Sequence, residues 1–128
     1  MAIKSTLQSP SPRCTCLTMV LVSLLCLSLP TRADDSSTEI GALLSQVAQS
    51  GCEFRRNGSV HSAEDAADHL RLKYRRGKRY VNSTEQFIDR LASESSWTGK
   101  AYSVICDGVE RPSRDWLYEA LASLRAPE

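Results

Sequence analysis

The feature that most constrains this chain is the apolar run over residues 14–29, because it removes the N-terminal segment from the folded part. Lys4 and Arg13 precede the run, and a short segment that ends with Ala33 follows it. Basic residues, an apolar stretch and small residues before a cleavage point are the parts of a secretory signal peptide. The sequence therefore predicts a signal peptide over residues 1–33, cleaved between Ala33 and Asp34.

Two other interpretations of this leader stay open. A membrane anchor is one, although an apolar run of 16 residues is short beside the roughly 20 residues of a spanning helix. A lipoprotein with Cys26 as acceptor is the other, although the bulky Leu25 stands where lipidation needs a small residue. We expect a soluble periplasmic or secreted protein that has no stable membrane insertion after cleavage.

Removal of the leader leaves two cysteines, Cys52 and Cys106, out of the five in the sequence. Cysteines of an exported protein meet an oxidising compartment, so we expect these two to form one structural disulfide. A redox role is the alternative, but distant, isolated cysteines lack the close pairing that tunes exchange. The chain contains two histidines and no paired-ligand spacing. We therefore expect no metal site and no cofactor.

Length and charge narrow the class of protein. The predicted mature chain has 95 residues, with 13 basic and 15 acidic side chains and a formal net charge of −2. This size suits one small domain and excludes a multidomain enzyme. The charge is not that of a dedicated nucleic-acid binder, so we expect no nucleic-acid partner.

Caps and apolar spacing predict four helices in residues 34–128. Ser36 with Glu39, and Ser83 with Gln86, have the spacing of capping boxes. Ser62 precedes a second helix, and Pro112 precedes the last one. The four apolar stripes are Ile40, Leu43, Leu44 and Val47; Ala66, Leu70 and Tyr74; Phe87, Ile88, Leu91 and Ala92; and Trp116, Leu117, Ala120, Leu121 and Leu124.

Two short alternating stretches, residues 52–55 and 101–106, predict strands. In each stretch the cysteine shares a face with large apolar side chains. Asn57-Gly58 and Asp107-Gly108 predict turns that end the strands. The sequence therefore predicts one α+β domain, with about four helices packed on a two- or three-stranded sheet and the disulfide on the core side.

The densest charge run is residues 71–80, with six basic residues in ten. One interpretation is the solvated C-terminal end of a helix, where the helix dipole favours basic side chains. The other is contact of the run from Arg71 to Arg79 with an anionic envelope surface. The sequence leaves both interpretations open.

His69 is the residue that most resembles a catalytic base. A partly buried, hydrogen-bonded histidine is one interpretation, and general-base chemistry is the other. A hydrolase would pair His69 with Ser93, Ser95 or Ser96, but no Gly-x-Ser-x-Gly or Ser-x-x-Lys spacing surrounds these serines. We assign no catalytic residue, and a small hydrolase that uses His69 with a serine of residues 93–96 is the alternative function.

Several stretches of the chain carry a family resemblance: residues 50–58 (SGCEFRRNG), 67–73 (ADHLRLK), 84–89 (TEQFID), 92–102 (ASESSWTGKAY) and the Trp116-Leu117 pair. In this order they resemble the YfeK-like family of small exported bacterial proteins, a domain of unknown function. The resemblance implies a periplasmic location, a single soluble domain and no established activity.

The resemblance also points to polar residues that a hydrophobic core does not need. These are Arg56, Asn57, His69, Arg71, Lys73, Ser95, Ser96, Thr98, Gly99 and Lys100. Their cations, amide and hydroxyls suit a carboxylate, a phosphate or a sugar, and glycine permits close backbone approach. We predict a non-enzymatic binding or interaction module for an anionic or glycan envelope component. The alternative is a polar network that ties the loops together.

Overall fold

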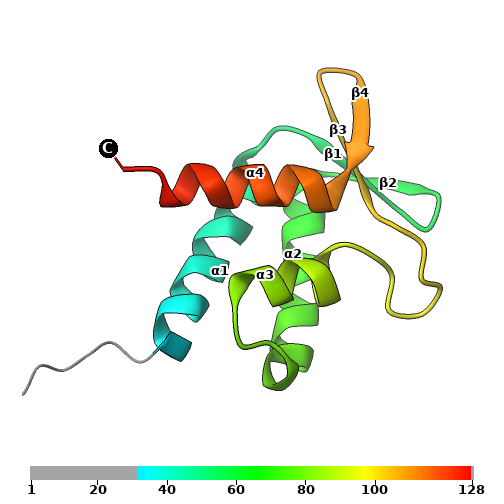
Figure 1. Ribbon diagram of the computed structural model, residues 1–128. Coiled ribbons are helices and arrows are strands. Elements are labelled where there is room, and N and C mark those ends of the chain that lie inside the picture. Colours follow the sequence, from blue (N-terminus) through cyan, green and yellow to red (C-terminus); the bar gives the residue numbers. More distant parts are fainter. Residues whose placement is uncertain (1–31, 128) are drawn as a thin grey trace, which may run out of the picture.

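The computed structural model describes residues 32–127, and in this part of the chain helices pack beside an antiparallel sheet (Figure 1). The elements, in chain order, are α1 (Arg32–Gln49), β1 (Glu53–Arg56), β2 (Ser59–His61), α2 (Ala63–Gly77), the 3₁₀ turn η1 (Lys78–Tyr80), α3 (Thr84–Phe87), the π-helical turn η2 (Ile88–Ala92), β3 (Ser103–Cys106), β4 (Val109–Pro112) and α4 (Ser113–Arg125). The α+β class and the four helices agree with the sequence prediction.

Most of the predicted leader, residues 1–31, lies outside the described residues. The expected cleavage point between Ala33 and Asp34 falls in the first turn of α1, and cleavage stays a prediction. Within residues 32–127, no helix combines the length and the apolar character needed to cross a membrane.

The sheet has four antiparallel strands in the order β2-β1-β3-β4, so the expected two or three strands were wrong. The missed strands, β2 and β4, return from two tight turns. Both central residues of each turn have positive φ: 49° and 83° at Asn57 and Gly58, and 51° and 78° at Asp107 and Gly108. These are the angles of type I′ turns, whose twist matches that of paired strands, so each turn produces a hairpin.

The predicted disulfide between Cys52 and Cys106 is confirmed. Cys52 directly precedes β1 and Cys106 ends β3, and these two central strands pair with Glu53 opposite Ile105. The bond therefore joins the two hairpins at the middle of the sheet.

Three of the predicted helix starts are confirmed and one is wrong. The helix α4 begins at Ser113, directly after Pro112, as predicted. The Ser62 hydroxyl accepts a hydrogen bond from the Asp65 amide at the start of α2, and Ser83 caps α3 in the same way. By contrast, α1 begins at Arg32, ahead of the capping box expected at Ser36. The Glu39 carboxylate of that expected box lies between helices instead.

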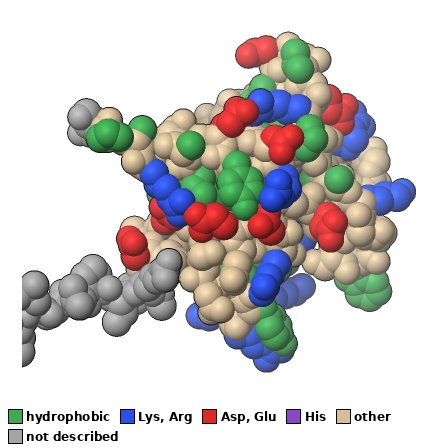
Figure 2. Space-filling view, viewed as in Figure 1, with side chains coloured by type: hydrophobic (Ala, Val, Ile, Leu, Met, Phe, Trp, Pro, Cys, Tyr) green, Lys and Arg blue, Asp and Glu red, His purple; other side chains and the backbone are tan. Residues whose placement is uncertain are grey.

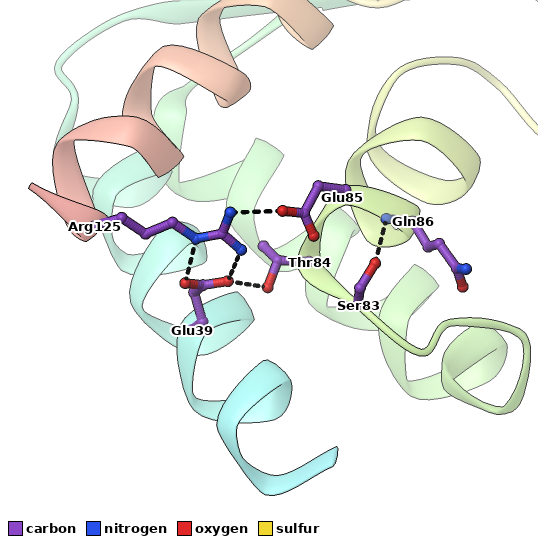
Figure 3. A network of polar contacts seen from close by, with 6 residues as sticks. All are labelled: Glu39, Ser83, Thr84, Glu85, Gln86 and Arg125. Atoms are coloured by element: carbon purple, nitrogen blue, oxygen red, sulfur yellow. Dashed lines mark hydrogen bonds and ion pairs between the residues drawn. The ribbon is translucent and has the colours of Figure 1, made fainter. Parts of the chain in front are cut away.

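Glu39 belongs to a polar cluster that joins three helices (Figure 3). The Arg125 guanidinium at the end of α4 donates to Glu39 of α1 and to Glu85 of α3, and the Thr84 hydroxyl also donates to Glu39. The hydrogen bond from Arg125 is the main cause that lowers the pKa of both carboxyl groups. In Figure 2, acidic and basic side chains accordingly alternate across this face of the molecule.

The hydrophobic core lies between the helices and one face of the sheet. Phe54 and Val104 contribute from β1 and β3, and the other buried apolar side chains come mostly from the predicted helical stripes: Ile40, Leu43, Leu44, Val47, Ala66, Ala67, Leu70, Phe87, Ile88, Ala92, Leu117 and Leu121. The polar side chains of α2 and of the loop after η2 are left to face a groove.

Candidate functional site

A groove of about 550 Å³ lies among α2, the β1–β2 hairpin and the loop of residues 93–100. Three peptide segments that are distant in sequence contribute to the groove. In Figure 1, the loop of residues 93–100 projects beside the β1–β2 hairpin. Its lining consists of Arg56, Asn57, His69, Leu72, Lys73, Arg76, Gly77, Leu91, Ser95, Ser96, Trp97 and Tyr102. We call this surface the α2 groove.

The α2 groove is cationic. Arg56, Lys73 and Arg76 line it, and no aspartate or glutamate does. The six ion pairs found among residues 32–127 leave out all three cations. Because no lining carboxylate neutralises these side chains, the groove can stabilise a bound anion.

The Tyr102 hydroxyl lies at the centre of the groove's hydrogen bonds. Lys73 Nζ donates to it over 3.3 Å, and His69 Nε2 lies 3.4 Å from it. Lys73 also donates to the backbone carbonyl of Glu94 over 2.8 Å, and its ammonium lies 5.0 Å from the centre of the Tyr102 ring. Tyr102 itself is 7% exposed, so it is a buried part of the groove lining.

Burial and neighbouring cations shift the pKa values of the groove. Burial, followed by the charges of Arg56, Lys73 and His61, lowers the pKa of His69 to about 4. Burial lowers the pKa of Lys73 to about 8, with Arg56 adding to the effect and Glu94 opposing it. At neutral pH, His69 is therefore uncharged, and about a tenth of Lys73 is a free amine.

Asn57 fastens the loop of residues 93–100 to the hairpin turn. Its amide nitrogen donates to Ser95 Oγ over 3.4 Å, and its carbonyl accepts from Thr98 Oγ1 over 2.7 Å. Ser95 Oγ also accepts hydrogen bonds from the backbone amides of Trp97 and Thr98. One wall of the α2 groove is thereby held by side-chain hydrogen bonds.

The groove brings together six of the ten residues singled out in the sequence: Arg56, Asn57, His69, Lys73, Ser95 and Ser96. The other four do not line it. Arg71 pairs with Asp68 over 2.7 Å, Thr98 bonds to Asn57, Gly99 supplies a backbone turn with φ of 68°, and Lys100 is exposed. Ligand binding by this set stays a prediction.

The hydrolase alternative needs a serine next to His69. Within residues 32–127, the side-chain partner of His69 is Tyr102. Ser93 donates to the Ile88 carbonyl, and Ser95 is occupied by two backbone amides. Among the described residues, neither Ser93 nor Ser95 is hydrogen-bonded to His69, whereas Ser96 lines the same groove as His69. The hydrolase alternative stays a prediction.

Six groove residues are absent from the predicted site, and three of them, Arg76, Trp97 and Tyr102, carry basic or aromatic side chains. Arg76 belongs to the basic run, for which the sequence left both a helix end and contact with an anionic surface open, and Tyr102 was predicted on the core face of a strand. Trp97 gave no periodic signal, yet its side chain is 97% exposed. A fully exposed tryptophan beside a polar groove is the kind of apolar surface that marks an interaction site.

A small cavity of about 30 Å³ lies beneath the groove. It shares Arg56, His69 and Tyr102 with the groove and is otherwise mostly apolar. Ser113, at the start of α4, also lines this cavity, and its hydroxyl is the one buried side-chain oxygen without a hydrogen-bond partner in the described part of the chain.

Comparison with known proteins places the groove in a domain without a known function. Residues 34–125 match the model of a family of unknown function, DUF5329. The chain is 44% identical over 82 residues to the uncharacterized protein YfeK of Salmonella typhimurium, which covers 61% of this chain and 68% of that protein. No solved structure matches the chain. The resemblance seen in the sequence is confirmed.

Proposed function

Because the chain belongs to the DUF5329 family, whose function is unknown, we propose a function from the α2 groove: the protein is an exported, non-enzymatic binding module for an anionic glycan or other anionic component of the cell envelope. The groove binds the anionic group, and the exposed aromatic side chain beside it contacts the neighbouring part of the ligand.

The observation that carries this proposal is the set of three groove cations without a carboxylate partner. Arg56 and Arg76 offer planar guanidinium donors, which suit carboxylate and phosphate, and Lys73 offers an ammonium group. The surrounding hydroxyls and the Asn57 amide offer neutral hydrogen bonds. Such a mixture is suited to a ligand that combines negative charge with hydroxyl groups.

Trp97 supports a glycan as part of the ligand. Its indole ring is fully exposed and belongs to the groove lining. A large aromatic ring contributes contact area at a small loss of conformational entropy, which favours binding through the apolar face of a ligand.

Export is supported by the sequence of the leader and by the disulfide between Cys52 and Cys106. Disulfides persist in oxidising compartments such as the periplasm. The ligands available there include peptidoglycan fragments, which carry both sugars and carboxylates.

Calorimetric titration with soluble peptidoglycan fragments that bear free carboxylates tests this function. We expect Arg56→Ala to weaken binding at least tenfold, because a charged hydrogen bond contributes about 1.5 to 3 kcal/mol. Added salt should weaken binding to the wild type, since the attraction is partly screened.

Arg71→Ala is the matched control, because Arg71 is also an arginine near the groove but pairs with Asp68 outside it. It should bind the fragments as the wild type does. Equal losses in both variants, or no heat of binding to the wild type at millimolar fragment, would reject the proposed function.

A further inference from the structure

We propose that Lys73 is a reactive amine that condenses with the carbonyl group of an anionic ligand, the open-chain aldehyde of a reducing sugar, to form an imine in the α2 groove. This inference rests on the proposed function for the binding of the anion, and it adds a covalent step and a substrate class to the same site.

The position of the Lys73 amine carries the inference. Lys73 lines the groove, and its nitrogen lies 3.3 Å from the Tyr102 hydroxyl and 2.8 Å from the Glu94 carbonyl. These two contacts fix the end of a flexible side chain, while the groove leaves room for a ligand beside it. An amine held beside a hydroxyl that can exchange protons with it is placed to act as a nucleophile toward a carbonyl group.

The groups around Lys73 favour its uncharged form. Arg56 from β1 and Arg76 from α2 line the same groove without a carboxylate partner there. Glu94 from the loop opposes them, but burial is the largest cause of the lowered pKa of about 8. Lys78 and Lys100 are exposed and do not line the groove, so they serve as reference amines in the same molecule.

Tyr102 can move the protons that the reaction requires. The free amine adds to the aldehyde carbon and forms a carbinolamine, whose C–O bond then breaks as the C=N bond forms. The Tyr102 hydroxyl gives its proton to the departing oxygen and regains one from the nitrogen, so both amine protons end on the released water. Neutral His69 lies 3.4 Å from that hydroxyl and keeps it hydrogen-bonded.

Reductive trapping tests the inference. The full-length protein is incubated at pH 7 with ribose 5-phosphate and cyanoborohydride, and the modified lysines are quantified by peptide mass spectrometry. We expect label at Lys73 to appear at least tenfold faster than at Lys78 or Lys100, because the groove holds the Lys73 amine beside the Tyr102 hydroxyl and lowers its pKa to about 8.

Variants and a pH profile separate reactivity from exposure. Tyr102→Phe should slow labelling of Lys73 at least fivefold and leave Lys100 unchanged, with thermal unfolding as the check on folding. The rate at Lys73 should rise with pH to a midpoint near 8. Equal rates at the three lysines, or Tyr102→Phe labelled as fast as the wild type, would overturn the inference.

Ribitol 5-phosphate and ribose distinguish this inference from the proposed function. Ribitol 5-phosphate keeps the anion without the aldehyde, and ribose keeps the aldehyde without the anion. Binding of ribitol 5-phosphate without any labelling of Lys73 by ribose 5-phosphate would reject the imine and retain the anion groove. Equally fast labelling by ribose, without binding of ribitol 5-phosphate, would retain the reactive lysine and reject the anion groove.

Discussion

Ser95 and Ser113 are both almost fully buried, at 5% and 2% exposure, yet their hydroxyls have opposite surroundings. Ser95 Oγ accepts from two backbone amides and from Asn57, whereas Ser113 Oγ has no partner within the described residues. A buried donor that loses its acceptor costs about 1 to 3 kcal/mol. The same substitution at the two positions should therefore have different effects.

We expect Ser95→Ala to lower the free energy of unfolding by about 1 to 3 kcal/mol, because the backbone amides of the loop lose their hydrogen-bond acceptor. Ser113→Ala should change it by less than about 0.5 kcal/mol, because no hydrogen bond is lost. Urea unfolding of the two variants measures the difference. A larger loss for Ser113→Ala than for Ser95→Ala would contradict the assigned hydrogen bonds.

At the scale of elements, the local signals in the sequence predicted the presence of the four helices but not the start of α1, and they missed half of the strands. Caps at Ser62 and Ser83 predicted the starts of α2 and α3 because they act over three residues. The strands β2 and β4 have only three and four residues and few apolar side chains. Their signal was the two turns with Asn-Gly and Asp-Gly, which by themselves require a returning strand.

Arg125 joins three helices, and its contribution to stability should depend on pH. The pKa values of Glu39 and Glu85 are lowered from 4.5 in the folded protein, chiefly by hydrogen bonds from Arg125. A lowered folded pKa stabilises the fold above the ordinary value, and this stabilisation is lost as the pH falls through the folded pKa. The cluster should therefore stabilise the fold at pH 7, and this stabilisation should decrease as the pH falls below about 4.5.

Arg125→Met keeps much of the apolar stem and removes the charge, so it isolates this contribution. We expect Arg125→Met to lower the free energy of unfolding by about 1 kcal/mol at pH 7, a modest value because the cluster is partly exposed. The decrease should be smaller at pH 3. Thermal unfolding of wild type and variant at both pH values measures it. Arg114→Met is the control, because Arg114 contacts one carboxylate, Asp89, and the Tyr118 ring without joining three helices. An equal loss of stability for Arg125→Met at pH 3 and at pH 7 would contradict the mechanism.

At the scale of the whole molecule, the composition of the α2 groove was partly predictable and its assembly was not. Arg56, Lys73 and Ser95 were singled out by residue type within stretches that resemble a family. Nothing local in the sequence, however, places the hairpin turn against the loop of residues 93–100, because Asn57 reaches Ser95 and Thr98 only after folding. The basic run likewise does not show which of its residues reach the groove: Arg76 lines it, whereas Arg71 lies outside it in a pair with Asp68.

The disulfide between Cys52 and Cys106 acts on the whole molecule, because it closes a loop with a sequence separation of 54 and joins the central strands of the two hairpins. The loop-entropy model gives a stabilisation of roughly 4 kcal/mol for a loop of this length, a large share of the stability of a small domain.

We therefore expect Cys106→Ser to lower the melting temperature by about 15 to 30 °C under oxidising conditions. Wild type in reductant, and the double variant Cys52→Ser/Cys106→Ser, should melt close to Cys106→Ser, since all three lack the same bond. A double variant that melts with the oxidised wild type would show that the paired strands β1 and β3 hold the two hairpins together without the covalent link.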